Sequence, residues 1–493
     1  MRLERQLKVL VINPPLRVSK PADIYPLGLC YVAAYLIESG IKVQILDLNA
    51  YRWTKNQFAE IFKKSSCDAV GIGGLVTAFN HVDWIARHVK EVNPHLPIFA
   101  GNTVSSTIPE ILLRNTCVDV AVIGEGELTT LELVERLENN ESLEGLKGIW
   151  YKDAKTGKLH ENPQREPITD IDALPFPAWD LVPMDIYIRN FKETYGFRGI
   201  ATSTVRGCPY NCSFCCKTFI GYRVRSRSPE NMIEELQLLL KKYRIEGFLP
   251  CDDLFTYDRN RTVKFCDLLV KNNLHHLRWI ASSRANLLTI PLAQKLKAAG
   301  CISLNFGFES HSQEVLDYYN KQITVRDQQN VIDICKKVGI SFAVSYIVGA
   351  QNEDEKTLEE TYRFCKKNHL RFNPSNLLMP QPQTKIYREC IERGIIRNEL
   401  EYIKKMASAG DADRFLVNVT EKLSDEELIA IFSKYRESGR SRRARLRNMA
   451  MNPRYYMTRL RGIESKAMLR KLMNLLKKEQ TQEKTTRNRN EWR

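Results

Sequence analysis

Val205-Arg-Gly-Cys-Pro-Tyr-Asn-Cys-Ser-Phe-Cys-Cys216 is the stretch that decides what the surrounding chain builds. Cys208, Cys212 and Cys215 stand in it with three and then two residues between them. Three thiolates on one loop can ligate three irons of a four-iron cluster and leave the fourth iron open to another ligand. A zinc site usually takes four ligands, and no matching Cys or His pair follows nearby. The spacing therefore predicts a 4Fe-4S cluster bound by these three thiols.

A repeated strand-helix pattern surrounds this loop. Strands are expected near 200–207, 247–252, 278–284, 301–309, 340–349 and 371–379. Six strand-helix units in succession are typical of a partial barrel of the TIM type, in which reactive side chains gather at the carboxyl ends of the strands. We therefore predict a (β/α)6 barrel over residues 196–383, with the cysteine loop directly after its first strand.

The chain before the barrel alternates in the same way. Up to residue 140, runs such as VLVINPP and AVGIGGL are apolar almost throughout, as strands buried on both faces are. Residues 1–140 are predicted to form a doubly wound, Rossmann-like parallel sheet, which makes the whole chain an α/β protein. Residues 141–195, with a turn at KDAKTG and the segment ITDIDALPFPAWDLVP, are expected to be a connector. Residues 384–493 are expected to be helical and basic.

Composition limits the classes of protein to consider. Of 493 residues, 43% are hydrophobic and 27% charged, near globular averages, and no stretch is apolar for long enough to cross a bilayer. The 13 cysteines are odd in number and scattered, which favours a reducing compartment over a disulfide framework. The N-terminus lacks the small-residue cleavage site of an export signal. We expect a cytoplasmic protein.

The net charge of +16 is concentrated at the C-terminal end. Residues 434–493 hold 19 Lys or Arg and 5 Asp or Glu, a net charge of +14. This charge indicates either an acidic partner, such as lipid headgroups or nucleic acid, or a solvated helix face. Apolar residues at helical spacing among cations predict an amphipathic helix that lies on an anionic membrane surface or packs against the barrel. These residues are Met468, Leu472, Leu475 and Leu476, with Arg470, Lys471, Lys477 and Lys478.

The cysteine loop resembles the C-x-x-x-C-x-x-C loop of the radical S-adenosylmethionine (SAM) superfamily. FLPCDDLFTYD, WIASSRANL, LNFGFES and VSYIVGAQNEDEKT are similar to the later-strand patterns of that superfamily. The resemblance implies that SAM binds the open iron and is cleaved to a 5'-deoxyadenosyl radical, with Phe214 beside the adenine. It also implies that the SAM pocket is lined by Asp252 or Asp253, Arg284, Glu309 and Gly349.

The same pocket residues also allow structural interpretations. A double aspartate at a strand end can cap a helix, Arg284 and Glu309 can form an ion pair with each other, and Gly349 can merely turn the chain. Their joint occurrence at strand ends favours the pocket.

Loops of small or polar residues follow the strands of the first 140 residues. Together with PLGLCYVAAYL they resemble the cobalamin-binding domain of B12-dependent radical SAM enzymes. The D-x-H-x-x-G motif that supplies a histidine to cobalt in other B12 proteins is absent, and His81 is interpreted as a cap or surface residue, so axial ligation of the cobalt stays open. The resemblance implies cobalamin contacts at Thr77, Gly101, Thr103, Gly124 and Glu125.

The resemblance implies a cobalamin-dependent radical SAM enzyme that methylates an unactivated carbon of a small-molecule or lipid-like substrate, with an electron donor such as flavodoxin or ferredoxin. An anaerobic oxidative cyclase of the magnesium-protoporphyrin monoester type, acting on a tetrapyrrole, has the same layout and stays an alternative. Transfer-RNA methylthiolation, and nucleic acid with it, is disfavoured because Asn13-Pro14-Pro15 stands where those enzymes carry a cysteine. A non-catalytic B12 sensor would have no use for the three-cysteine loop.

Overall fold

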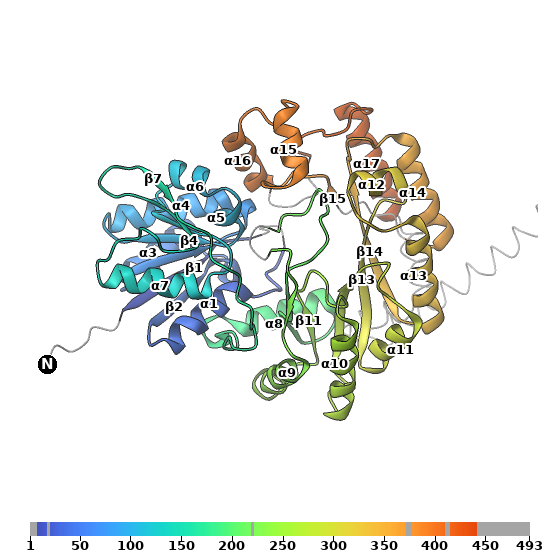
Figure 1. Ribbon diagram of the computed structural model, residues 1–493, viewed down its shortest axis with the longest axis horizontal. Helices are drawn as coiled ribbons and strands as arrows, with labels where there is room; N and C mark the ends of the chain where they lie inside the picture. Colours follow the sequence, from blue (N-terminus) through green and yellow to red (C-terminus); the bar gives the residue numbers. More distant parts are fainter. Residues whose placement is uncertain (1–6, 17–19, 218–220, 371–375, 410–414, 441–493) are drawn as a thin grey trace, which may run out of the picture.

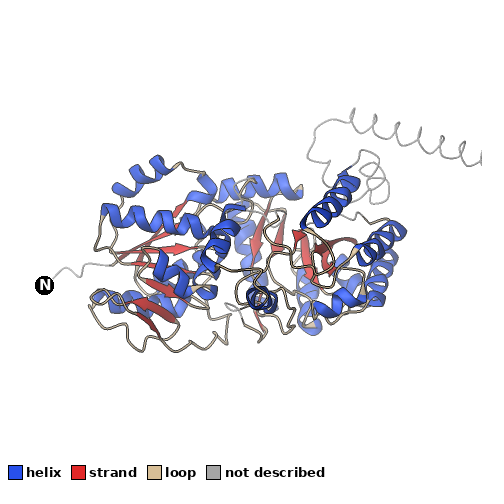
Figure 2. Ribbon diagram, turned by 90° about the horizontal axis from the view of Figure 1, so that it is seen from above, coloured by secondary structure: helices blue, strands red, loops and turns tan. Residues whose placement is uncertain are grey.

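Two units of parallel strands and flanking helices lie side by side in the computed structural model, with C-terminal helices above the space between them (Figures 1 and 2). The structure describes residues 7–16, 20–217, 221–370, 376–409 and 415–440. The predicted fold class, a Rossmann-like sheet followed by a partial barrel, is confirmed.

The first sheet has the strand order β2-β1-β3-β4-β5-β6-β7, and its first five strands in chain order are parallel. Because β2 and β3 lie on opposite sides of β1, the strand order reverses there, and loops that follow β1 and β3 diverge to open a binding edge. The strands are β1 (Lys8–Asn13), β2 (Lys42–Asp47), β3 (Ala69–Gly73), β4 (Ile98–Gly101), β5 (Val120–Val122), β6 (Ile149–Lys152) and β7 (Leu159–Glu161).

Helices cover both faces of this sheet, and local signals fix several of their ends. Helix α3 begins with a capping box between Thr54 and Gln57. The helices are α1 (Leu27–Glu38), α2 (Leu48–Tyr51), α3 (Lys55–Lys63), η1 (Val76–Ala78), α4 (Phe79–Val92), α5 (Thr103–Thr107), α6 (Pro109–Asn115) and α7 (Glu127–Glu138).

The segment expected to be a connector adds to the first sheet. The hairpin predicted at KDAKTG is present, and its two strands extend the sheet: β6 pairs with β5 and β7 pairs with β6, both in antiparallel fashion. The chain then continues through η2 (Trp179–Leu181) and α8 (Met184–Tyr195). Trp179 donates its indole N–H to the Tyr25 hydroxyl at 3.1 Å, which holds the aromatic segment against the first unit.

The second sheet runs in chain order from β8 to β15 with parallel neighbours, as a partial barrel does. Its strands are β8 (Gly199–Thr202), β11 (Gly247–Pro250), β12 (Arg278–Ser283), β13 (Cys301–Glu309), β14 (Ser341–Val348) and β15 (Asn376–Leu377). The last strand was expected over 371–379, of which 371–375 lie outside the described residues. The helices are α9 (Pro229–Tyr243), α10 (Arg259–Lys271), α11 (Ile290–Ala298), α12 (Gln313–Tyr318), α13 (Val325–Val338) and α14 (Glu355–Asn368).

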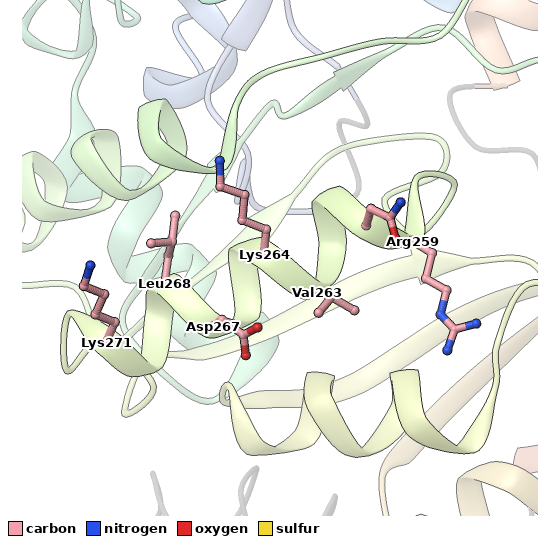
Figure 3. A pocket seen from close by; sticks show the side chains of 7 residues that line it. Arg259, Val263, Lys264, Asp267, Leu268 and Lys271 are labelled. Carbon is pink, nitrogen blue, oxygen red and sulfur yellow. The ribbon is translucent and has the colours of Figure 1, made fainter.

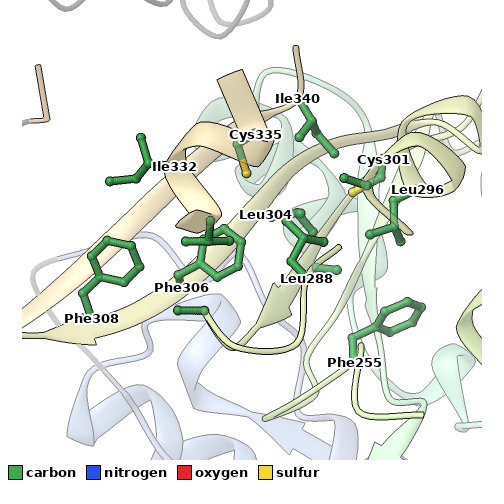
Figure 4. Close-up of a cluster of buried hydrophobic side chains, with 14 of the residues drawn as sticks. Phe255, Leu288, Leu296, Cys301, Leu304, Phe306, Phe308, Ile332, Cys335 and Ile340 are labelled. Carbon is green, nitrogen blue, oxygen red and sulfur yellow. The ribbon is translucent and has the colours of Figure 1, made fainter. Parts of the chain in front are cut away.

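The barrel core is apolar and closely packed between strands and helices (Figure 4). Leu304, Phe306 and Phe308 of β13 lie next to one another with Ile332 and Cys335 of α13. Burial of such side chains contributes roughly 1.5–3 kcal/mol each, so this core fixes the barrel whose strand ends carry the cysteine loop.

Helices α15 (Lys385–Glu392) and α16 (Glu399–Ala409) join the two units, and α17 (Asp425–Arg440) packs on the barrel. The Asn80 amide donates to the Lys404 carbonyl at 3.1 Å and to the Ser408 hydroxyl at 3.0 Å, which ties α16 to the start of α4. Within the described residues, no helix has both the length and the apolar character to cross a membrane. The amphipathic helix predicted around Met468–Lys478 lies outside the described residues.

Candidate functional site

A two-stranded stem connects the cysteine loop to the carboxyl end of β8. Strands β9 (Val205–Arg206) and β10 (Arg225–Ser226) pair in antiparallel fashion, with Arg206 opposite Arg225. Gly207 begins the loop with φ +90°, and a Cβ there would stand 2.2 Å from the Arg223 carbonyl oxygen. Only glycine can therefore close the loop at this point.

The three predicted cluster ligands line one cavity of about 440 Å³. Cys208, Cys212 and Cys215 are all free thiols. In the described parts of the chain, no three His, Cys, Asp or Glu side chains converge on a point that would hold a single ion, and the thiolates of a four-iron cluster each bind a different iron. Burial raises the pKa of Cys215 to about 12, so this thiol needs a nearby metal cation to ionise.

The cavity brings together most of the residues predicted for SAM. Phe214, Asp253, Arg284 and Glu309 line it together with the cysteines. The Arg284 guanidinium lies 3.6 Å over the Tyr210 ring and donates to the Lys321 carbonyl. Glu309 does not pair with Arg284; instead it accepts from Lys321 Nζ at 2.7 Å, and both side chains are buried.

The cavity also contains two lysines, which the sequence patterns did not single out. Lys217 donates to the Cys208 carbonyl at 3.2 Å, and Lys321 lies between Glu309 and Phe214. Gly307 makes room for the second of these, because a Cβ there would stand 2.3 Å from Glu309 Oε1 and 2.9 Å from Lys321 Nζ. Lys217 follows the cysteine loop directly and could have been noticed, whereas Lys321 is far from it in sequence and carried no signal.

The two neighbouring aspartates, of which the sequence implied one or the other, occupy different places. Buried Asp252 accepts from the backbone N–H groups of Thr204 at 2.7 Å and Val205 at 2.9 Å, and from the Thr204 hydroxyl, so it holds the chain that enters the cysteine loop. Asp253 lines the cavity. Burial raises the pKa of Asp253, and the Lys217 ammonium opposes that rise.

Gly349 directly follows β14. It is not among the residues that line this cavity. Its φ is +111°, and its N–H donates to the carboxylate of Glu353, which also accepts from Ala350 at 3.4 Å. Burial raises the pKa of Glu353 to about 7, and the two backbone donors oppose that rise. Sequence reasoning missed Glu353, although the first acid of the run Glu353-Asp354-Glu355, four residues after a strand-end glycine, could have drawn notice.

The loops predicted to contact cobalamin meet at the carboxyl edge of the first sheet. The Thr103 hydroxyl accepts from the Val76 N–H at 2.8 Å, which joins the η1 loop that contains Thr77 to the loop after Gly101. The Gly124 N–H donates to the Ser106 hydroxyl at 3.0 Å, which joins the loop after β5 to α5. Half-buried His81 lies in the first turn of α4, and its pKa is lowered by burial and by nearby Lys55 and Arg52.

Glu125, the fifth residue of that prediction, is engaged by the barrel. Its carboxylate accepts from Arg206 at 2.8 Å, from Arg225 at 2.6 Å and from the Ile168 N–H at 2.8 Å. The observed contacts of Glu125 therefore tie the first unit to the stem of the cysteine loop.

The residues present fit the three predicted cofactors. Buried polar atoms that lack a hydrogen-bond partner among the described residues include Arg284 Nε, in the lining of the cysteine cavity, and Ser105 Oγ, in α5 after β4. Gly101 has no atom within 4 Å of the place a Cβ would occupy, which leaves room for a large ligand beside the backbone. Polar groups of this kind are ordinarily satisfied, so a ligand at each site accounts for them.

A second hollow, of about 580 Å³, lies on the outer face of α10 (Figure 3). Arg259, Lys264 and Asp267 line it, and all of its lining residues come from this one helix. It shares no residue with the cysteine cavity, and side chains from one convex face do not converge on a ligand.

Family models match both units of the chain. The model of the radical SAM superfamily matches residues 202–365. The model of the B12 binding domain matches residues 15–134. The two matches cover the cysteine loop and all five predicted cobalamin contacts, Thr77, Gly101, Thr103, Gly124 and Glu125.

Relatives match this chain across most of its length. An uncharacterized methyltransferase of Pyrococcus horikoshii is 32% identical over 79% of this chain and 84% of its own length. An anaerobic magnesium-protoporphyrin IX monomethyl ester cyclase of Rubrivivax gelatinosus is 29% identical over 73% of this chain and 66% of its own. The structure of TsrM from Kitasatospora setae, a radical SAM methyltransferase with cobalamin and a [4Fe-4S] cluster bound, has the same fold, with a TM-score of 0.65 and 19% identity over 78% of this chain and 75% of that one.

Proposed function

This chain belongs to the radical SAM superfamily and carries a B12-binding domain, and from that premise we propose that it methylates an unactivated carbon of a small-molecule substrate. The proposal depends on cobalamin bound at the carboxyl edge of the first sheet, and on a cluster and SAM bound in the barrel.

One observation carries the proposal: a single cavity is lined by three free thiols, by Arg284, whose guanidinium lies 3.9 Å from Cys212 Sγ, and by the buried Glu309–Lys321 pair. Three thiols suit a cluster with an open iron, and charged side chains in the same cavity suit a zwitterionic ligand that reaches that iron. The Pyrococcus horikoshii relative, which matches over most of its length, is a methyltransferase by name, and this favours methyl transfer as the outcome.

When bound, cluster, SAM and cobalamin supply an adenosyl radical for hydrogen abstraction and a methyl group for transfer. The protein's part is to hold and orient them. Cys208, Cys212 and Cys215 would bind the cluster, while Arg284, Asp253 and Phe214 would orient SAM. The closely packed apolar core of the barrel would keep water away from the bound cofactors on its side of the cavity.

The partners follow from the same chemistry. Tetrapyrroles and isoprenoid-like lipids are the substrate classes to test first, with flavodoxin or ferredoxin as the one-electron donor. Contact with a membrane surface depends on the basic residues beyond 440, and vesicle co-sedimentation of the full chain against a chain that ends at residue 440 tests it.

A second candidate is oxidative cyclisation, because the Rubrivivax gelatinosus cyclase is 29% identical to this chain. Methyl-labelled SAM separates the two functions. A product heavier than its substrate by one labelled methyl group supports methylation, and a substrate-derived product without label supports cyclisation.

The direct test is anaerobic turnover of the reconstituted chain with SAM and cobalamin, followed by measurement of 5'-deoxyadenosine. Wild type should release it, and Cys208→Ser should lose at least about a hundredfold because the cluster would lack one of its three protein ligands. Cys390→Ser is the matched control, since Cys390 is a buried thiol in α15 outside the cavity. Equal release by Cys208→Ser and wild type would refute the assignment.

A further inference from the structure

The cysteine loop is framed by two arginines that face each other. Arg206 and Arg225 are paired across β9 and β10, and all three cluster cysteines lie between them in the sequence. Both side chains are mostly buried, 13% and 4% exposed, so each needs an anionic partner. The position of the loop therefore depends on what these two guanidinium groups bind.

Both arginines bind the same short loop of the first unit. Glu125 accepts from Arg206 at 2.8 Å and from Arg225 at 2.6 Å, one with each carboxylate oxygen, and Glu127 accepts from Arg206 at 2.7 Å. The two carboxylates are 9% and 5% exposed. Two acids thus neutralise two bases inside the interface, and Glu125 bridges the two strands of the stem.

The acids belong to a loop at the edge where cobalamin is proposed to bind. Glu125 follows Gly124, whose N–H is tied to Ser106, and Glu127 begins α7. On the other side, Arg206 lies 5.3 Å over the ring of Tyr31 in α1. Gly124, at the edge where cobalamin is proposed to bind, is therefore the direct chain neighbour of Glu125, whose ion pairs hold the stem of the cysteine loop.

We infer that Glu125 is a positioning residue that couples the two cofactor sites: it fixes the stem of the cysteine loop to the corrinoid edge, so that order at either site stabilises the other. This rests on the proposed function, which places cobalamin at that edge. Linkage makes the effect reciprocal, because a ligand that favours the ordered Gly124–Glu127 loop also favours the ordered stem, and the reverse.

Thiol labelling of the cluster-free, full-length chain tests the inference without turnover. A maleimide is applied anaerobically at one fixed pH, with and without saturating cyanocobalamin, and trypsin then releases the peptide 207–217, which mass spectrometry follows over time. Cys390 serves as an internal reference for global unfolding. Cyanocobalamin binding is measured separately by equilibrium dialysis.

Wild type should label slowly, and cyanocobalamin should slow it further by about fivefold or more, the lower end of coupling between linked sites. Glu125→Gln should label faster than wild type without ligand and should lose the protection by cyanocobalamin. The double variant Glu125→Gln, Arg225→Gln, which keeps the net charge of the protein, should behave in the same way. This result separates loss of the ion pairs between Glu125 and the stem from a change in the charge near the thiols.

Glu132→Gln is the matched control. Glu132 also bridges two arginines, Arg136 and Arg165, but it lies within α7 and contacts no part of the stem. It should label as wild type does, with full protection by cyanocobalamin.

The outcomes separate the inference from the proposed function. If Glu125→Gln and wild type label at equal rates without ligand, Glu125 does not hold the stem of the cysteine loop in place. If wild type binds cyanocobalamin but gains no protection, or if Glu125→Gln binds it and keeps the protection, the coupling is wrong. If wild type binds no cyanocobalamin in dialysis, the proposed function falls and the coupling with it, whatever the ligand-free rates are.

Discussion

Lys321 Nζ lies 2.7 Å from the carboxylate of Glu309, and both side chains are less than 10% exposed. Glu309 stands at the end of β13 with φ +61°, a conformation that costs a residue other than glycine of order 1–3 kcal/mol. The pair therefore holds a carboxylate at the mouth of the barrel in a position that the backbone alone does not favour.

Removal of the lysine should leave a buried charge without its partner. We expect Lys321→Gln to lower the free energy of unfolding by about 3–5 kcal/mol. Urea unfolding followed through intrinsic tryptophan fluorescence measures this. Lys295→Gln, in the exposed Lys295–Asp267 pair, should change it by less than about 1 kcal/mol. Equal effects of the two substitutions would contradict the assignment of the Glu309–Lys321 pair as a buried one.

The two neighbouring aspartates should fail in different ways. Asp252→Ala removes the acceptor for the N–H groups of Thr204 and Val205, so the reconstituted protein should hold markedly less iron per chain. Asp253→Ala should keep its iron and bind SAM at least about tenfold more weakly, as expected for a group that touches the ligand. Iron assay and equilibrium dialysis with SAM measure the two effects; a loss of iron from Asp253→Ala alone would reverse the assignments.

Gly207→Ala should abolish most cluster incorporation, because the new Cβ would stand 2.2 Å from the Arg223 carbonyl oxygen and φ is +90°. Gly221→Ala is the control: its φ is +72°, but no atom lies within 4 Å of its Cβ position, so it costs only the roughly 1 kcal/mol of a left-handed residue. Visible absorbance of the cluster after anaerobic reconstitution distinguishes them. Comparable cluster absorbance in both variants would contradict the prediction and would show that the backbones at Gly207 and Arg223 can move apart.

Glu353 should make stability depend on pH in a specific direction. Its pKa is raised to about 7 from 4.5, so the folded state binds the proton more tightly than the unfolded state. Its contribution is therefore fully present below about pH 4.5 and is lost as pH rises through about 7. Glu353→Gln cannot ionise, so its stability relative to wild type should improve by about 3 kcal/mol between pH 5 and pH 8. Urea unfolding at both pH values tests this, and a constant difference between the two proteins would rule it out.

Local patterns in the sequence were enough to predict the class of fold and the cluster chemistry. Strand-helix periodicity and the spacing of Cys208, Cys212 and Cys215 are local properties, because side-chain direction repeats along each element and a loop ligand set lies within eight residues. The hairpin at KDAKTG was local in the same sense.

The division of roles among the charged residues could be seen only in the folded molecule. It placed Asp252 under the loop and Asp253 in the cavity, paired Glu309 with Lys321 and not with Arg284, and gave Glu125 to Arg206 and Arg225. It also added β6 and β7 to the first sheet and laid α16 over its edge. Contacts of this kind join segments up to hundreds of residues apart, and they depend on how whole elements pack, which no periodicity or short motif records.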